Sequence, residues 1–135
     1  MDARLIVSDL VGKPFKDGAR GPDAFDCWGL TMTAMLCFGW ALPDFHVAAF
    51  DAAKINNEID KQRDVWQELA IPEPGCIVVM RFGCHNHVNH VATFIGDGMM
   101  LHTREKTGSV IERANSPVFK ALINGYFLPP EKYRI

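Results

Sequence analysis

The hydrophobic and polar positions divide the chain into a helix-rich first half and a strand-rich second half. Residues 3–10 place leucine and isoleucine at helical spacing, and Gly12 and Pro14 stop that helix. Residues 26–38 are apolar around most of the helix circumference, which predicts a central helix. A further helix is expected over residues 56–69, where apolar side chains fall near one face and charges on the other.

The second half consists of short runs rich in β-forming residues. They follow a turn over residues 72–75 and comprise residues 77–80, 88–95, 99–102, 110–113 and 125–128. The sequence Gly96-Asp97-Gly98 between two of them predicts a tight hairpin. Because short connections favour antiparallel pairing, helices followed by such a sheet predict an α+β fold. No repeat or linker interrupts the chain, so we expect one domain over residues 1–135.

Composition narrows the function classes. The chain has 135 residues, of which 48% are hydrophobic and 22% charged, so it is large enough to bury a core without disulfides or structural metal. A net charge of −2 means that basic residues are not in excess, which argues against nucleic acid as a partner. The N-terminus lacks the pattern of a signal peptide, and the longest uncharged stretch, residues 28–43, is too short to span a membrane. We therefore expect a protein made in the cytoplasm with free thiols.

The segment from Gly21 to Leu30 places Cys27 in the first turn of the predicted central helix. Backbone N–H groups without a helical partner and the positive end of the helix dipole favour a thiolate at that position. Asp26 is the natural N-cap because its carboxylate accepts from those N–H groups. This arrangement predicts a reactive cysteine.

Two of the five histidines are placed to serve that cysteine. His90 opens a predicted strand and His102 ends the strand that returns from the hairpin, so both lie at one end of the sheet. We expect Cys27 to be the nucleophile, His90 the base, and His102 the group that orients His90.

These residues resemble the motifs of the NlpC family of papain-like cell-wall cysteine peptidases. Residues Asp26-Cys27-Trp28-Gly29-Leu30 match the family's nucleophile motif, and His90-Val91-Ala92-Thr93-Phe94-Ile95-Gly96 matches its base strand. His102 takes the place of the orienting histidine. Gly12-Lys13-Pro14-Phe15 and Pro74-Gly75-Cys76 match two further family segments, so the resemblance covers most of the chain.

The resemblance implies a papain-like NlpC fold, with the cysteine helix packed on an antiparallel sheet of about five strands. It implies hydrolysis of an amide bond in peptidoglycan stem peptides without a cofactor or metal, and substrate-binding roles for Asp26, Trp28 and Phe15. The Gly-Pro-Asp segment before the cysteine and Trp28 after it are most similar to the phage branch. That branch implies phage tail proteins as partners and a location in the virion tail.

Two positions depart from the family pattern. The resemblance implies that Phe15 stands where relatives carry a tyrosine whose hydroxyl assists the oxyanion. The loss of one oxyanion donor lowers the rate by about 10²–10³. The backbone N–H of Cys27 remains as a donor. Trp28 stands where many bacterial relatives carry serine, so the indole should reshape the pocket and their substrate preference is not transferred.

Three alternatives remain. Cys84, His85, His87 and His90 lie within one short segment and suit zinc, although structural zinc modules draw their ligands from separate paired clusters. The chain is alternatively a phage tail assembly component whose peptidase-like domain has little or no activity. A third hypothesis is an acyl- or amide-transferring enzyme, which is disfavoured because lipid-acting relatives carry the histidine before the cysteine.

Overall fold

The computed structural model describes residues 7–44, 57, 61, 65–82 and 90–135. Its helical elements are the 3-10 helix η1 (Ser8–Leu10), the α-helices α2 (Cys27–Cys37) and α4 (Pro117–Leu122), and the 3-10 helix η2 (Glu131–Tyr133). Its strands are β1 (Gln67–Leu69), β2 (Cys76–Met80), β3 (His90–Gly96), β4 (Met99–Arg104), β5 (Gly108–Arg113) and β6 (Ile123–Leu128).

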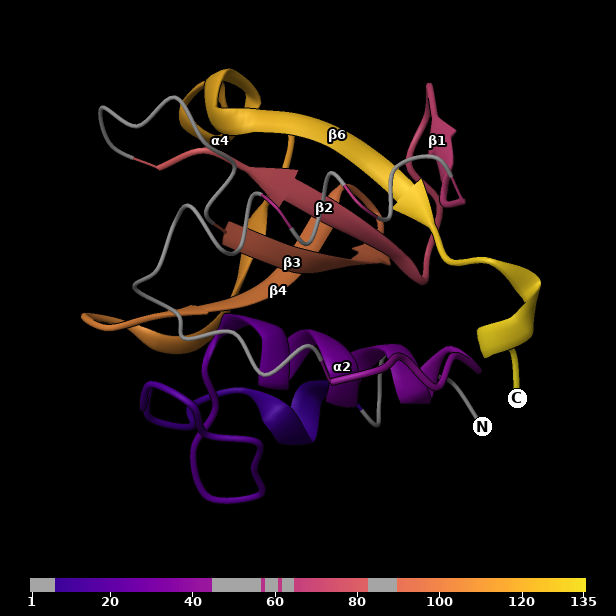
Figure 1. Cartoon of the computed structure of the whole chain (residues 1–135). Helices are drawn as coiled ribbons and strands as arrows, with labels where there is room; N and C mark the ends of the chain where they lie inside the picture. Colours follow the sequence, from indigo (N-terminus) through magenta and orange to yellow (C-terminus); the bar gives the residue numbers. More distant parts are fainter. Residues whose placement is uncertain (1–6, 45–56, 58–60, 62–64, 83–89) are drawn as a thin grey trace.

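The strands form one sheet in the order β1-β6-β2-β3-β4-β5, and every neighbouring pair is antiparallel. In Figure 1, α2 lies below the sheet next to β4 and β3, whereas α4 lies at the far end beside β6. The α+β fold predicted from the sequence is confirmed. The sheet has six strands within the described residues rather than about five, because β1 joins its edge.

Helix α2 follows the prediction for residues 26–38 closely. Asp26 caps it by accepting a hydrogen bond from the backbone N–H of Gly29, and it ends at Cys37 with Phe38 as its C-cap. Gly39 follows with a φ of 90°, a left-handed conformation that glycine adopts without strain and that stops the helix. Local signals alone therefore account for both ends of this helix.

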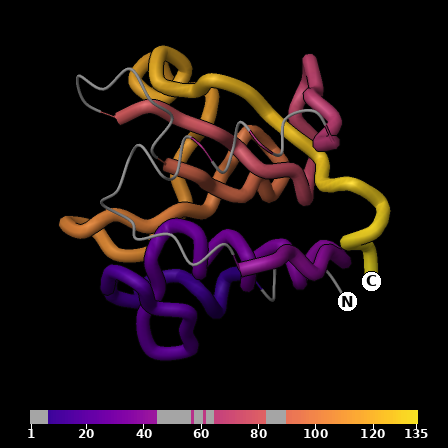
Figure 2. Tube along the Cα trace, viewed as in Figure 1, coloured from indigo at the N-terminus to yellow at the C-terminus, as the bar shows by residue number. Residues whose placement is uncertain are grey.

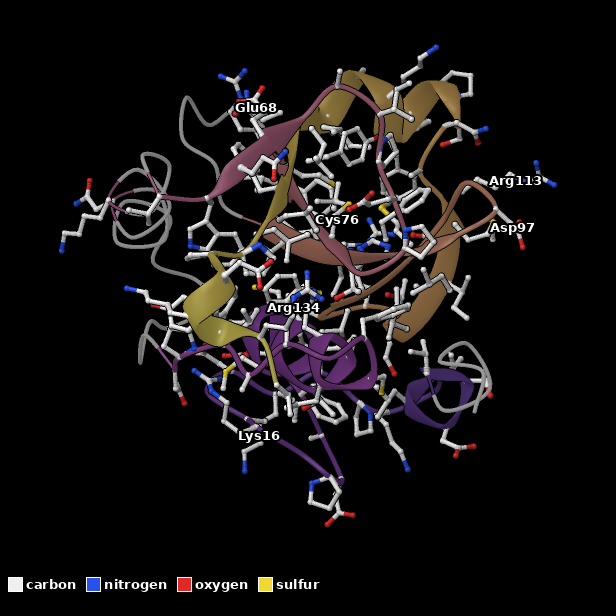
Figure 3. All side chains as sticks on the ribbon, turned by 90° about the vertical axis from the view of Figure 1, so that its right-hand side faces the viewer. Lys16, Glu68, Cys76, Asp97, Arg113 and Arg134 are labelled. Carbon is white, nitrogen blue, oxygen red and sulfur yellow. The ribbon has the colours of Figure 1, made fainter. Side chains whose placement is uncertain are left out.

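The core lies on both faces of the sheet. Alternation along β2 sends Ile77 and Val79 to the face that packs against Met35 of α2. Cys76 and Val78 point to the opposite face, in a cluster that includes residues of β3, β4 and α4. Figure 3 shows Cys76 inside the molecule, whereas charged residues such as Glu68, Asp97 and Arg113 lie at its periphery.

The predicted hairpin between β3 and β4 is confirmed. Asp97 and Gly98 occupy the turn with φ values of 54° and 73°, and two consecutive left-handed residues are typical of a type I′ turn. This turn reverses β3 into β4 and therefore brings His90 and His102 to the same end of the sheet.

The helix predicted over residues 56–69 is wrong at its C-terminal end. Residues Gln67–Leu69 form β1, which pairs with Tyr126–Leu128 of β6. Hydrogen bonding to a distant strand overrides a helical pattern that is only local. Asn57 and Lys61 are helical, and Trp66 is buried in the core as its apolar character suggested. Residues 3–6 of the first predicted helix lie outside the described residues.

Two elements near the C-terminus, α4 and η2, were not predicted. Ser116 caps α4 by accepting from the N–H of Phe119, and Pro117 stands at its start. The C-terminal segment then runs from β6 down to the layer that contains α2, as Figure 2 shows. There the guanidinium of Arg134 lies 4.1 Å from the centre of the Trp40 ring. No described helix is both long and apolar enough to cross a membrane.

Candidate active site

Cys27 is the first residue of α2, directly after the Asp26 N-cap. Its sulfur is reached by the backbone N–H groups of Val91, Trp28 and Cys27 itself. Val91 is the second residue of β3, so the thiol lies where the helix N-terminus meets the start of that strand. The predicted placement of Cys27 is confirmed, and the described cysteines Cys27, Cys37 and Cys76 are free thiols as expected.

The expectation of a thiolate in the resting protein is wrong. The residue is only 6% exposed, and burial raises the pKa of Cys27 from 9.0 to about 12. The negative charge of Asp26 raises the pKa further, and the three nearby N–H groups offset only part of these effects. The same residue that caps the helix therefore opposes ionisation of the thiol, and the resting side chain is a neutral S–H.

His90 is a buried, neutral imidazole at the start of β3. Its Nε2 lies 2.8 Å from Nδ1 of His102, and the ring of Phe82 stacks on it at a centroid distance of 4.3 Å. Burial lowers the pKa of His90 well below 6.5, and the nearby His102 and the charge of Arg104 lower it further. A neutral imidazole can accept a proton, as a general base requires.

His102 links His90 to a carboxylate that was not predicted from the sequence. Its Nε2 lies 2.5 Å from Oε2 of Glu112 on β5. Burial lowers the pKa of His102, and Glu112 opposes that shift without reversing it. The contact is therefore a hydrogen bond from a neutral ring to the carboxylate rather than an ion pair.

The strand register explains how these three groups meet. Pairing between β3 and β4 extends only to Thr93 opposite Leu101, so the strands separate towards His90. Between β4 and β5, His102 pairs with Val110 and Met100 with Glu112. His102 and Glu112 are thus diagonal neighbours on one face of the sheet, within reach of each other.

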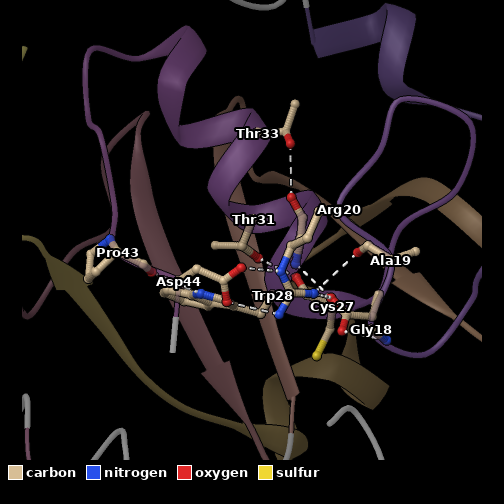
Figure 4. A network of polar contacts seen from close by, with 11 residues as sticks. Gly18, Ala19, Arg20, Cys27, Trp28, Thr31, Thr33, Pro43 and Asp44 are labelled. Atoms are coloured by element: carbon tan, nitrogen blue, oxygen red, sulfur yellow. Dashed lines mark hydrogen bonds and ion pairs between the residues drawn. The ribbon is translucent and has the colours of Figure 1, made fainter. Parts of the chain in front are cut away.

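Asp26 is fully buried and connects the loop before Cys27 to the start of α2 through hydrogen bonds. Its Oδ2 accepts from the N–H of Gly18 at 3.1 Å, and its Oδ1 accepts from Gly29 at 2.7 Å and from Arg20 at 2.8 Å. Arg20 also binds both carboxylate oxygens of Asp44, at 2.9 and 3.0 Å. Figure 4 shows Arg20 between Asp44 and the start of α2. Asp26 is 0% exposed, and its predicted contact with substrate stays a prediction.

Trp28 and Phe15 each contact a different neighbour of the cysteine segment. The indole N–H of Trp28 donates to the carbonyl of Pro43 at 3.1 Å, and the ring packs against the core cluster of α2. Phe15 forms a β-bridge with Phe25, two residues before Cys27, and is partly buried. Trp28 follows Cys27 directly, whereas Phe15 comes near it only through the bridge to Phe25. The predicted contacts of both residues with substrate stay predictions.

Several features of the site were missed at the sequence level. Glu112 could have been found from strand alternation, since Val110 and Glu112 share a face in the strand after His102. Phe82 follows β2 and carries no sequence signal for stacking on His90. The residues Cys84, His85 and His87 of the alternative zinc site lie outside the described residues, so that alternative stays untested.

Comparison with known proteins identifies relatives of the chain. A family model described as the NlpC/P60 family matches residues 12–126. The chain is 28% identical over 100 residues to the "Probable endopeptidase p60" of Listeria grayi, which covers 74% of this chain and 17% of that protein. It is 30% identical over 95 residues to a "Probable endopeptidase" of Mycobacterium tuberculosis, covering 69% and 20%. The chain spans about a fifth of the length of these curated relatives.

Solved structures show the same fold. A protein of the NLP/P60 family from Staphylococcus aureus, described as similar to lipoprotein, superposes with a TM-score of 0.67 at 20% identity over 96% of this chain and 41% of that chain. The peptidoglycan hydrolase RipB from Mycobacterium tuberculosis superposes with a TM-score of 0.56 at 17% identity over 96% and 67%. The family match extends from the loop before the cysteine helix almost to the end of the last strand, and the chain belongs to the NlpC/P60 family.

Proposed function

We propose that this chain is a cysteine peptidase that hydrolyses an amide bond in the stem peptides of peptidoglycan. The observation that carries the proposal is the meeting of Cys27, at the N-terminus of α2, with the start of β3, where His90 lies 2.8 Å from His102. The relatives named as probable endopeptidases and the peptidoglycan hydrolase that shares the fold support the substrate class.

The proposed first half-reaction forms an acyl-enzyme. The sulfur of Cys27 attacks the amide carbonyl carbon while His90 takes the thiol proton, because both groups are neutral in the resting site. The backbone N–H of Cys27 donates to the oxyanion of the tetrahedral intermediate. His90 then gives its proton to the leaving amine, the C–N bond breaks, and a thioester to Cys27 remains.

The second half-reaction is hydrolysis of that thioester. His90 removes a proton from a water molecule that attacks the thioester carbonyl, and the proton returns to the sulfur as the C–S bond breaks. The carboxylic acid product leaves and the neutral thiol and imidazole are restored. Apart from the substrate and this water molecule, the two half-reactions use only residues of the chain.

Phe15 bears on the rate of this reaction. Its ring cannot donate a hydrogen bond, and its bridge to Phe25 places it beside the segment that leads to Cys27. If a hydroxyl at this position assists the oxyanion in relatives, this chain lacks that contribution, which amounts to about 10²–10³ in rate. We therefore propose slow turnover rather than a different reaction.

Mass spectrometry of purified stem peptides tests the proposal. We expect the wild-type protein to release fragments that differ by cleavage of one amide bond, and Cys27→Ala to release none. Cys37→Ala is the matched control, since Cys37 is a half-buried cysteine at the other end of the same helix and should leave cleavage unchanged.

The outcomes separate the competing hypotheses. Full cleavage by Cys27→Ala would eliminate Cys27 as the nucleophile. A folded wild-type protein that turns over no stem peptide would favour the assembly-component hypothesis. Products joined to an added amine in preference to hydrolysed products would favour a transferase.

A narrower part of the proposal is association with a phage tail. It rests on the residues Gly21, Pro22 and Asp23 before the cysteine and on Trp28 after it. Co-purification of the protein with tail particles would support this association, and its absence from washed particles would contradict it without touching the proposed chemistry.

A further inference from the structure

The carboxylate of Glu112 lies at the end of the histidine pair, and the reaction described above gives it no role. Glu112 is the outermost member of a continuous chain of contacts that starts at His90 and passes through His102. The side chain of His102 is 0% exposed, whereas that of Glu112 is 31% exposed. The guanidinium of Arg104 lies 3.7 Å from the same carboxylate oxygen. The carboxylate of Glu112 therefore faces both solvent and a cation.

An ionised carboxylate accepts hydrogen bonds and donates none. The nitrogen that faces it, Nε2 of His102, must therefore carry the proton. Since burial keeps His102 neutral, its other nitrogen, Nδ1, carries no proton and can only accept.

The protonation of His102 in turn determines that of His90. Nδ1 of His102 lies 2.8 Å from Nε2 of His90, so Nε2 of His90 must donate. His90 is neutral as well, which leaves its Nδ1 without a proton. That bare nitrogen is the one a base needs in order to accept the thiol proton.

We propose that Glu112 is a positioning residue that fixes the tautomers of both histidines and thereby makes Nδ1 of His90 the basic nitrogen of the site. This inference deepens the proposed function and rests on it. Reversing the pattern would put a proton on Nδ1 of His90, and the ring could then not accept one from Cys27.

Glu112→Gln is the direct test, because an amide has nearly the same shape but can also donate. Its NH₂ group can face Nε2 of His102, which permits the reversed tautomer in both rings. We expect kcat for stem-peptide cleavage to fall about 10–100-fold, by analogy with carboxylates that hydrogen-bond to and orient metal-ligating histidines, with little change in KM. Glu105→Gln is the control, since Glu105 is an exposed carboxylate in the turn between β4 and β5.

A readout that does not depend on activity comes from nitrogen-15 NMR of histidine-labelled protein, which distinguishes the two tautomers. We expect His90 and His102 to be protonated at Nε2 in the wild type and in Glu105→Gln, and to shift towards Nδ1 protonation in Glu112→Gln. A wild-type His90 protonated at Nδ1, or tautomers unchanged by Glu112→Gln, would overturn the inference. The expected tautomers in a protein that cleaves no stem peptide would instead contradict the proposed function.

Discussion

At the residue scale, the ionisation of Cys27 depends on its surroundings more than on its position in the helix. The helix N-terminus and the nearby N–H groups favour the thiolate, but burial and the Asp26 carboxylate raise the pKa to about 12. The sequence predicted the first influence because it acts through local backbone structure. The sequence could not predict the burial of the thiol, because burial arises only when α2 packs against β3 and β4.

This balance predicts slow alkylation of Cys27 in the free protein. A pKa of about 12 instead of 9.0 makes the thiolate fraction near pH 8 roughly a thousandfold smaller than for an ordinary thiol. We expect iodoacetamide to modify Cys27 slowly at pH 8 and faster as the pH rises above 9. Peptide mapping gives the rate for each cysteine separately.

Asp26→Asn sharpens this prediction. The amide oxygen still caps the helix, but the negative charge that raises the thiol pKa is gone, so Cys27 should be alkylated faster than in the wild type at the same pH. Cys37, at the far end of α2, serves as the internal reference in both proteins. Rapid modification of Cys27 below pH 8 in the unmutated protein would restore the thiolate expectation.

At the element scale, the start of α2 packs tightly against the loop that precedes it. A Cβ atom added to Gly29 would lie 2.3 Å from the carbonyl oxygen of Ala19. That carbonyl also accepts from the backbone N–H of Asp26, so the loop and the helix touch directly. The glycine two residues after the cysteine is therefore required by close packing against the loop and not by its backbone conformation.

Gly29→Ala should for this reason lower the free energy of unfolding although alanine is the better helix former. We expect overpacking to destabilise by about 1–3 kcal/mol, of which the gain of about 1 kcal/mol in helix propensity offsets a part. Urea denaturation followed by circular dichroism measures the difference. The control is Leu36→Ala on the same helix, where the side chain is 52% exposed and the change should stay within about 0.5 kcal/mol. Equal stability of Gly29→Ala and the wild type would show that the loop moves aside.

At the scale of the whole molecule, the elements defined by local signals were predicted well and those defined by long-range pairing were not. The central helix, the hairpin at Gly96 to Gly98 and the α+β class follow from caps, turn residues and alternation. The helical pattern over residues 56–69 runs into β1, which only pairing with β6 makes a strand. Strand alternation puts Glu112 on the same face as Val110, but only the register between β4 and β5 brings that face to His102.

The proposed chemistry depends on residues from distant parts of the chain. Although the chain spans about a fifth of its curated relatives, its described residues bring together the thiol, the two histidines and the carboxylate that the proposed reaction uses. The purified chain should therefore form the acyl-enzyme without a further module.

The most direct measurement is mass spectrometry of the protein after brief incubation with stem peptide and acid quenching. We expect an added mass equal to the acyl half of the peptide, mapped to the tryptic peptide that contains Cys27. The adduct should be present in Cys37→Ala and absent from Cys27→Ala. Two results together would contradict the proposed role of Cys27: no adduct on Cys27 while the peptide is cleaved, and undiminished cleavage by Cys27→Ala.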